Sequence, residues 1–260
     1  MADWQQSIST PELTPGEVHV WRIRLDIADD SWRALASLLT NDERIKAERF
    51  HFEKHRRRHI VGRAALRTLL GQYLDRSPQL IEFSYNSHGK PRLARSVSGI
   101  RFNLSHTEEI MLVAFALDSE VGIDIESLMR DVDCMDVGQR WFSGLEGQAL
   151  RALPEDARRD AFFRIWSRKE AYIKARGDGI SHPLHRFSVS MDKHEPRLIE
   201  HQDDTSEKSR WRFIDIDVGE KYQATVVVKS SHWKLRFHCL CRPPFHSWSR
   251  SATTAGQDIK

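Results

Sequence analysis

The sequence predicts an α+β fold in two halves. A block of helical patterns followed by strand patterns occurs twice along the 260 residues, and a hydrophobic content of 40% suffices for a buried core. We expect an N-terminal half over residues 1–127, a C-terminal half over 128–242 and a loose tail over 243–260. The halves share no residue-level repeat, so their similarity is one of element order.

In the N-terminal half, residues 18–27 alternate between apolar and polar side chains and predict a strand. Helical patterns follow at 31–39, 41–52 and 56–74, with Thr40 or Asn41 as the cap of the second. Two short strands at 80–85 and 100–104 are separated by an expected loop, "NSHGKPRLARSVSG". The runs "IMLVAFAL" and "EVGIDIE" flank Asp118-Ser119, which predicts a tight hairpin.

The C-terminal half begins with helical segments that extend to about residue 176. Strand patterns then occur at 186–191, 211–216, 222–229 and 234–240, and the Asp/Ser/Lys-rich stretch 192–209 reads as a polar loop. Cys134, Cys239 and Cys241 lack the spacing of a zinc site or a disulfide framework, and the last two should share one strand face. The absence of a secretory pattern and of a long apolar run indicates a cytoplasmic protein without a membrane segment.

Basic residues concentrate in "KHRRRHIVGRAALR", residues 54–67, although the net charge is only +3. Such a cluster suits a phosphate-bearing ligand, an acidic protein or nucleic acid. A solvated helix face explains the segment equally well when it is taken alone.

Two carboxylates stand one residue apart in the otherwise apolar "VGIDIES", residues 121–127. The period of two places Asp124 and Glu126 on one strand face while Val121, Ile123 and Ile125 point into the core. Neighbouring carboxylates raise each other's pKa unless a cation lies between them, and Mg²⁺ is a natural partner for oxygen ligands. Taken alone, the pattern is more typical of two exposed acids on an amphipathic strand.

A second stretch, "IWSRKEAYIKARGDGI" at residues 165–180, changes this balance. On a helix, Trp166, Glu170 and Lys174 lie on adjoining positions, and Gly177 ends the helix. Glu170 and Lys174 could form an ordinary ion pair and Trp166 could be an ordinary core residue. A helix carboxylate beside the strand pair would instead provide a third metal ligand.

The two stretches together resemble the paired motifs of the 4′-phosphopantetheinyl transferases, specifically the large Sfp-type branch. That branch has G-I/V-D-I/V-E followed by W-x-x-K-E-A-x-x-K, and both motifs are present here in order. The segments "HGKP" (88–91) and "FNLSH" (102–106) and the Arg-rich helix with Gly62 also resemble family segments. The similarity covers about residues 40–190, and the combination of both motifs is highly specific.

The resemblance implies a fold of two similar halves related by a pseudo-twofold axis, with the active site in the cleft between them. It implies an enzyme that transfers the phosphopantetheine arm of coenzyme A to a serine of an apo acyl or peptidyl carrier protein and releases adenosine 3′,5′-bisphosphate. The implied metal is Mg²⁺, held by Asp124, Glu126 and Glu170, since Ile125 between the first two acids cannot ligate. We expect a monomer, because both parts of the site lie in one chain.

The resemblance also implies roles for individual residues. Glu170 is the candidate base for the serine, and Lys174 would stabilise the pyrophosphate. Glu146 corresponds to another family acid of unassigned role. The implied coenzyme A contacts are Lys46, Arg57, Arg58, Lys90, Ser105, His106, Lys169 and Lys174.

Two other classes compete with this interpretation. A non-catalytic nucleic-acid or phosphate-binding protein would use the Arg-rich helix, but residues 54–67 contain no aromatic side chains besides histidine. The three acids would also repel a nucleic acid, so we expect no nucleic-acid partner. A Mg²⁺-dependent nucleotide hydrolase or nucleotidyl transferase could use the same acids, but no Gly-rich phosphate loop accompanies them.

Overall fold

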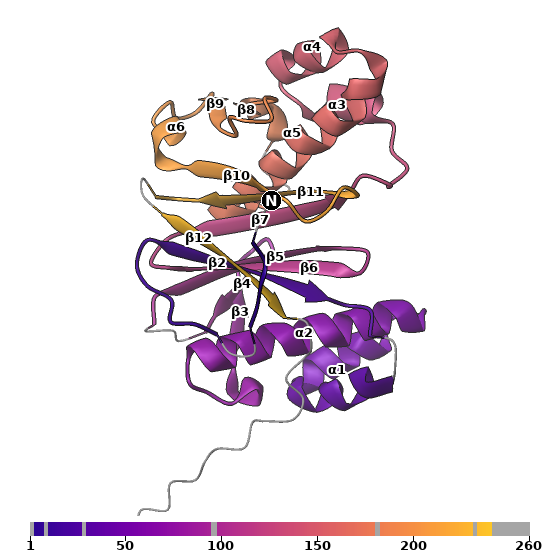
Figure 1. Ribbon diagram of the computed structural model, residues 1–260, viewed down its shortest axis with the longest axis vertical. Coiled ribbons are helices and arrows are strands. Elements are labelled where there is room, and N and C mark those ends of the chain that lie inside the picture. Colours follow the sequence, from indigo (N-terminus) through magenta and orange to yellow (C-terminus); the bar gives the residue numbers. More distant parts are fainter. Residues whose placement is uncertain are drawn as a thin grey trace, which may run out of the picture.

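The computed structural model describes residues 3–7, 10–27, 30–94, 98–179, 183–230 and 233–240. Two sheets lie face to face in the middle of the molecule, and helices cover their outer faces (Figure 1). The helices of the N-terminal half lie on one side and those of the C-terminal half on the other. This arrangement confirms the predicted α+β class in two halves.

The N-terminal sheet has the strand order β1-β12-β2-β6-β5. Its members are β1 (Gln5–Gln6), β12 (Lys234–Leu240), β2 (Glu17–Arg24), β6 (Ile110–Leu117) and β5 (Ile100–Thr107). Strand β12 comes from the range expected to form the C-terminal half, yet it pairs in parallel with β2. The C-terminal part of the chain therefore contributes one strand to the N-terminal half.

The outer face of this sheet is covered by α2 (Glu53–Tyr73), α1 (Asn41–Glu48) and a 3₁₀ helix (Asp30–Leu38). Thr40 is the N-cap of α1, and its backbone N–H donates to the Glu43 side chain at 3.1 Å. Glu43 is also buried against Arg67 of α2 at 2.6 Å. The capping acid thus fixes α1 to α2, and both helices position the basic residues described below.

The C-terminal sheet has the order β10-β11-β7, with β10 (Arg212–Ile216), β11 (Tyr222–Val228) and β7 (Val121–Ser127). Its outer face packs on α5 (Glu155–Arg176), which α3 (Cys134–Trp141) and α4 (Gly144–Ala152) adjoin. As predicted, Val121, Ile123 and Ile125 of β7 lie in a core cluster with residues of the N-terminal sheet. The intervening residues of β7 therefore face α5.

Two positions set the relation of β7 to α5. A Cβ atom at Gly122 would lie 2.1 Å from the Ala171 carbonyl oxygen and 2.3 Å from the Ala175 nitrogen, so only glycine permits this approach. Gly177 ends α5 with φ 82°, the left-handed conformation that was expected of it at this point.

The predicted hairpin at Asp118-Ser119 is wrong. Strand β6 pairs with β2 and β5, whereas β7 pairs with β11 in the other sheet, so the turn connects the two halves. The hairpin of this region is formed by β5 and β6. Strand β7 instead packs closely on α5 at Gly122.

Two segments assigned to loops contain regular structure. The 192–209 stretch includes β9 (Leu198–His201), which pairs with β8 (Phe187–Val189), and the short helix α6 (Glu207–Arg210). The 86–99 stretch includes β4 (Pro91–Leu93), which pairs with β3 (Phe83–Tyr85). Short 3₁₀ helices occur at Pro78–Leu80 and Leu184–Arg186. Cys241 and the tail from residue 243 lie outside the described residues.

None of the helices in the described ranges is long and apolar enough to span a membrane.

Candidate active site

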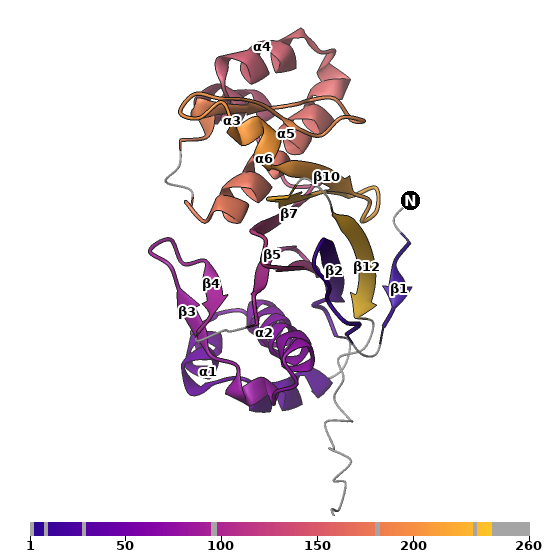
Figure 2. The same cartoon turned by 90° about the vertical axis from the view of Figure 1, so that its left-hand side faces the viewer.

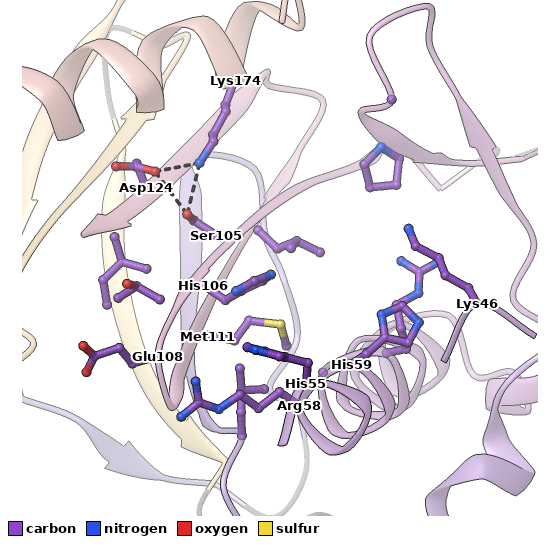
Figure 3. Close-up of a pocket in the computed structure, with 18 of the residues that line it drawn as sticks. Lys46, His55, Arg58, His59, Ser105, His106, Glu108, Met111, Asp124 and Lys174 are labelled. Atoms are coloured by element: carbon purple, nitrogen blue, oxygen red, sulfur yellow. Dashed lines mark hydrogen bonds and ion pairs between the residues drawn. The ribbon is translucent and has the colours of Figure 1, made fainter. Parts of the chain in front are cut away.

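A cavity of about 760 Å³ lies between the halves. Residues of α1, α2, β5, β6, β7 and α5 line it, so both halves contribute to it. Figure 3 shows Asp124, Ser105 and Lys174 on one side of this cavity and Lys46, Arg58 and His59 on the other. The predicted residues that line it are Lys46, Arg58, Ser105, His106, Asp124, Glu126, Glu170 and Lys174.

Strand β7 places Asp124 at the floor of the cavity, where the residue is only 2% exposed. Its Oδ1 accepts hydrogen bonds from the Lys174 ammonium at 2.6 Å and from the Ser105 hydroxyl at 3.1 Å. Lys174 also donates to Ser105 at 3.0 Å, which closes a triangle of contacts (Figure 3). The Oδ2 atom of Asp124 is buried and has no hydrogen-bond partner among the described residues.

Glu126 lines the same cavity two residues further along β7. Its carboxylate accepts from the Trp166 indole at 3.2 Å and lies 3.4 Å from the Arg130 guanidinium. Burial, and next the Asp124 charge, raise the pKa of Glu126 above its ordinary value. The two acids of the motif therefore interact, although each also has cationic or donor neighbours.

Helix α5 presents Glu170 and Lys174 one turn apart. Burial, with further contributions from Asp124 and Glu126, raises the pKa of Glu170 to about 7. Burial alone would lower the pKa of the Lys174 ammonium, but the carboxylates of Asp124, Glu170 and Glu126 outweigh it and raise that pKa. The three acids thus hold more negative charge than Lys174 compensates.

This donor set fits a hard divalent cation. Within the described residues, no three or more His, Cys, Asp or Glu side chains are already gathered into a metal-binding group. The unpartnered Oδ2 of Asp124 and the raised pKa values of Glu126 and Glu170 are nevertheless what a missing positive charge would leave. Carboxylate oxygens are the ligands that Mg²⁺ prefers in proteins.

The opposite side of the cavity, called the cationic side below, has Lys46 from α1 and Arg58 from α2 (Figure 3). The histidines His55 and His59 of α2 and His106 of β5 also line the cavity. Burial, followed by the charges of Lys46 and Arg63, lowers the pKa of His59 to about 4. Burial also lowers the pKa of His106. A phosphate would meet Lys46 and Arg58 on this side, whereas the acid-lined floor would accept a phosphate only with a cation between them.

Three residues that were predicted to contact the ligand do not line the cavity, and their side chains contact other parts of the protein. The Arg57 guanidinium lies 3.3 Å from Asp26, which also binds Arg58 at 2.8 Å. The Lys90 ammonium donates to backbone carbonyl oxygens at the junction of the halves. Lys169 is fully buried in the C-terminal half and lies 2.7 Å from Glu146, so these two residues form an internal ion pair.

Several residues at the site were missed by the sequence analysis. Trp166 packs against the C-terminal core, as one interpretation of the sequence had it, and its indole N–H also donates to Glu126 at 3.2 Å. Arg130 follows Glu126 by four residues, and His55 and His59 lie one turn apart on α2 beside Arg58. Spacing along α2 could have indicated the histidines, since positions 55, 58 and 59 share a helix face.

Known proteins are similar to this chain over most of its length. A sequence model described as the 4′-phosphopantetheinyl transferase superfamily matches residues 120–227, and one described as 4′-phosphopantetheinyl transferase, N-terminal, matches residues 26–117. The chain is 37% identical to the 4′-phosphopantetheinyl transferase HetI of Nostoc sp. over 231 residues, which cover 87% of this chain and 94% of HetI. It is 32% identical over 156 residues to Sfp of Bacillus subtilis, covering 60% of this chain and 67% of Sfp. The crystal structure of Thermotoga maritima holo-[acyl-carrier-protein] synthase superposes with a TM-score of 0.34 and 20% identity over 42% of this chain and 61% of that chain.

Proposed function

Because the chain belongs to the 4′-phosphopantetheinyl transferase superfamily, we propose that the cavity between its halves binds coenzyme A with Mg²⁺ and transfers the phosphopantetheine arm to a carrier-protein serine. The transferase activity and coenzyme A as substrate follow from the family. The bound metal, the roles of the individual residues and the docking surface are proposals for this chain, and each needs its own experiment.

The observation that carries the metal site is the buried, unpartnered Oδ2 of Asp124 beside two carboxylates with raised pKa. Asp124, Glu126 and Glu170 would hold Mg²⁺, and the ion would neutralise charge on the pyrophosphate. Lys174 touches Asp124 directly and adds a second positive charge at the same place. These four residues lie on β7 and α5, and Ser105 of the N-terminal sheet contacts Asp124 and Lys174.

The chemistry requires few covalent steps from the protein. The serine oxygen forms a bond to the phosphorus that bears the pantetheine arm, the bond from that phosphorus to the bridging oxygen breaks, and adenosine 3′,5′-bisphosphate leaves. Glu170 lines the cavity beside Asp124 and Glu126, and we assign to it the acceptance of the serine proton. Lys174, fixed by Asp124 and Ser105, would stabilise the charge that develops on the phosphate oxygens.

The cationic side of the cavity suits the remaining phosphate of coenzyme A. Lys46, Arg58 and His106 line it, and we assign to them the contacts with the nucleotide part of the substrate. Arg58 keeps a bidentate contact with Asp26, with distances of 3.0 and 2.8 Å, so its orientation is fixed before substrate binds. Preorganised cations bind a phosphate at a lower entropic cost.

The carrier protein would dock at the rim of this cavity. Arg130 lines the cavity and is 60% exposed, and its neighbour Met129 is 69% exposed. Across the cavity Phe52 is 63% exposed and its ring lies 6.0 Å from that of His55, which also lines the cavity. A basic and apolar rim suits an acidic carrier with apolar contacts around its serine. We further propose that the enzyme acts as a cytoplasmic monomer.

Intact-mass spectrometry tests the proposal. Apo acyl and apo peptidyl carrier proteins are incubated separately with the enzyme, coenzyme A and Mg²⁺, and the released nucleotide is measured in parallel. We expect a carrier to gain the mass of one phosphopantetheine arm for each adenosine 3′,5′-bisphosphate released. Release of nucleotide without a mass gain would support a hydrolase instead.

A further inference from the structure

The β3–β4 hairpin of the N-terminal half reaches across to the C-terminal half. It lies at the outer edge of the lower half in Figure 2, with its tip toward the end of α5. The turn between its strands contains Asn86 and Lys90, which both make contacts with the last turn of α5. The last turn of α5 contains Lys174.

The Asn86 side chain stabilises the turn and also makes a contact outside it. Its side-chain oxygen accepts from the backbone N–H groups of His88 at 3.0 Å and Lys90 at 2.8 Å. Its side-chain nitrogen donates to the carbonyl oxygen of Gly177 at 2.8 Å. The last carbonyls of a helix have no partner within the helix, so Asn86 supplies one from the other half.

Lys90 also donates hydrogen bonds to backbone carbonyl oxygens near the end of α5. Its ammonium donates to the carbonyl oxygens of Ala175 at 3.0 Å and Val121 at 3.4 Å, and lies 3.6 Å from Glu120. The side chain is only 9% exposed. A cation at a helix C-terminus interacts favourably with the helix dipole, and here it also touches the first residue of β7.

The Lys90 contacts join the two elements that carry the acids of the active site, and Asn86 holds the turn that carries Lys90 to the end of α5. Val121 precedes Asp124 by three residues on β7, and Ala175 follows Lys174 on α5. We propose that Asn86 and Lys90 are positioning residues that clasp the end of α5 to β7 and so set the distance between Glu170 and Asp124. This inference rests on the proposed function, and it assigns Lys90 a role other than contact with coenzyme A.

The first test is Asn86→Asp. The substitution keeps an oxygen for the two N–H groups of the turn, but it replaces the donor to Gly177 by a second acceptor. We expect kcat to fall about 10- to 100-fold, as for other residues that orient ligands. The KM for coenzyme A should stay within about twofold, because no phosphate contact is removed. The Mg²⁺ concentration for half-maximal rate should rise.

The second test compares Lys90→Met with Lys90→Arg. Methionine fills similar space but has no hydrogen-bond donor, whereas arginine can still donate to both carbonyl oxygens. We therefore expect kcat to fall in Lys90→Met and to be largely retained in Lys90→Arg. Lys193→Met, at an exposed lysine of the C-terminal half, is the matched control and should behave as wild type. The double variant N86D/K90M should lose less than the product of the single losses, because both contacts act on one helix end.

Amide hydrogen exchange gives a readout that does not depend on turnover. Exchange in residues 171–177 should accelerate in the Asn86→Asp variant, while the β3–β4 turn keeps its protection. A higher KM for coenzyme A with unchanged kcat in Lys90→Met would identify a substrate contact and overturn the inference. Wild-type kcat in both variants would overturn it as well. A wild-type enzyme that transfers the arm to no carrier would refute the proposed function. The exchange rates would still show whether Asn86 and Lys90 hold the end of α5 in place.

Discussion

Substitution of Lys169 by methionine should destabilise the protein without touching the substrate site. Lys169 is fully buried, and its ammonium lies 2.7 Å from the Glu146 carboxylate. Glu146 also accepts from the backbone N–H groups of Ser143 at 2.9 Å and Val189 at 2.8 Å, so the acid stays in place when the lysine is removed. The variant therefore contains a buried carboxylate without its countercharge.

Loss of one partner of a buried ion pair costs about 3–5 kcal/mol. A domain of ordinary stability has about 5–15 kcal/mol in total, so the single variant should lose roughly a fifth or more of its free energy of unfolding. The double variant K169M/E146Q removes both charges. It should recover only part of the loss, because the unpaired charge is gone but the glutamine can accept from only one of the two backbone N–H groups of Ser143 and Val189.

Urea unfolding followed by tryptophan fluorescence measures these differences. Wild type, both single variants and the double variant form a cycle that isolates the pair's interaction. The double variant, assayed well below its unfolding transition, should keep the wild-type KM for coenzyme A. A strongly raised KM for coenzyme A in the double variant would indicate that Lys169 contacts the substrate. A Lys169→Met variant with wild-type stability would refute the expected cost of the unpaired Glu146 carboxylate.

Three further results are expected. Glu170→Gln removes the proton acceptor and should lower kcat about 100- to 10,000-fold with the fold intact. Gly122→Ala places a methyl group 2.1 Å from the Ala171 carbonyl oxygen and should destabilise the protein by about 3 kcal/mol or more. His238 is 5% exposed, and burial, followed by the neighbouring His19 and Arg236, lowers its pKa from 6.5 to about 4. Its unfolded form therefore binds a proton more readily, so stability should fall by up to about 3 kcal/mol as the pH drops from 6.5 to 4, and remain level above 6.5.

Each of these results has its own control. Circular dichroism and thermal unfolding show whether Glu170→Gln is folded, and full activity in the folded variant would exclude this acid from the reaction. Gly122→Ala with wild-type stability would mean that β7 and α5 can separate freely. His238→Phe removes one titrating group, so its stability should depend less on pH than that of wild type; equal slopes would assign the acid sensitivity to other residues.

Local patterns predicted much of the site. The period of two placed Asp124 and Glu126 opposite the apolar residues of β7, and the spacing of four placed Glu170 beside Lys174 on α5. Thr40 at the start of α1 and Gly177 at the end of α5 were also found, because capping depends on the residue itself and its nearest neighbours.

Contacts between distant segments could not be predicted in this way. The motif "WSRKEAYIK" contains Lys169 next to Glu170, but only the tertiary structure shows that Lys169 faces Glu146 while Glu170 faces the cavity. Lys90 lies in a turn typical of ligand contacts, and its true neighbours belong to β7 and α5. The same limitation explains the wrong hairpin, since β7 pairs with β11, about a hundred residues later in the sequence.

The central claim is that a divalent cation on Asp124, Glu126 and Glu170 makes the transfer possible. The most direct measurement is the rate of carrier modification by enzyme treated with EDTA, before and after Mg²⁺ is added, in wild type and in Asp124→Asn. The account predicts no transfer without metal, full recovery of wild type with Mg²⁺, and little or no recovery of the variant at the same concentration. Undiminished transfer in EDTA, or an Asp124→Asn variant with the wild-type Mg²⁺ response, would contradict it.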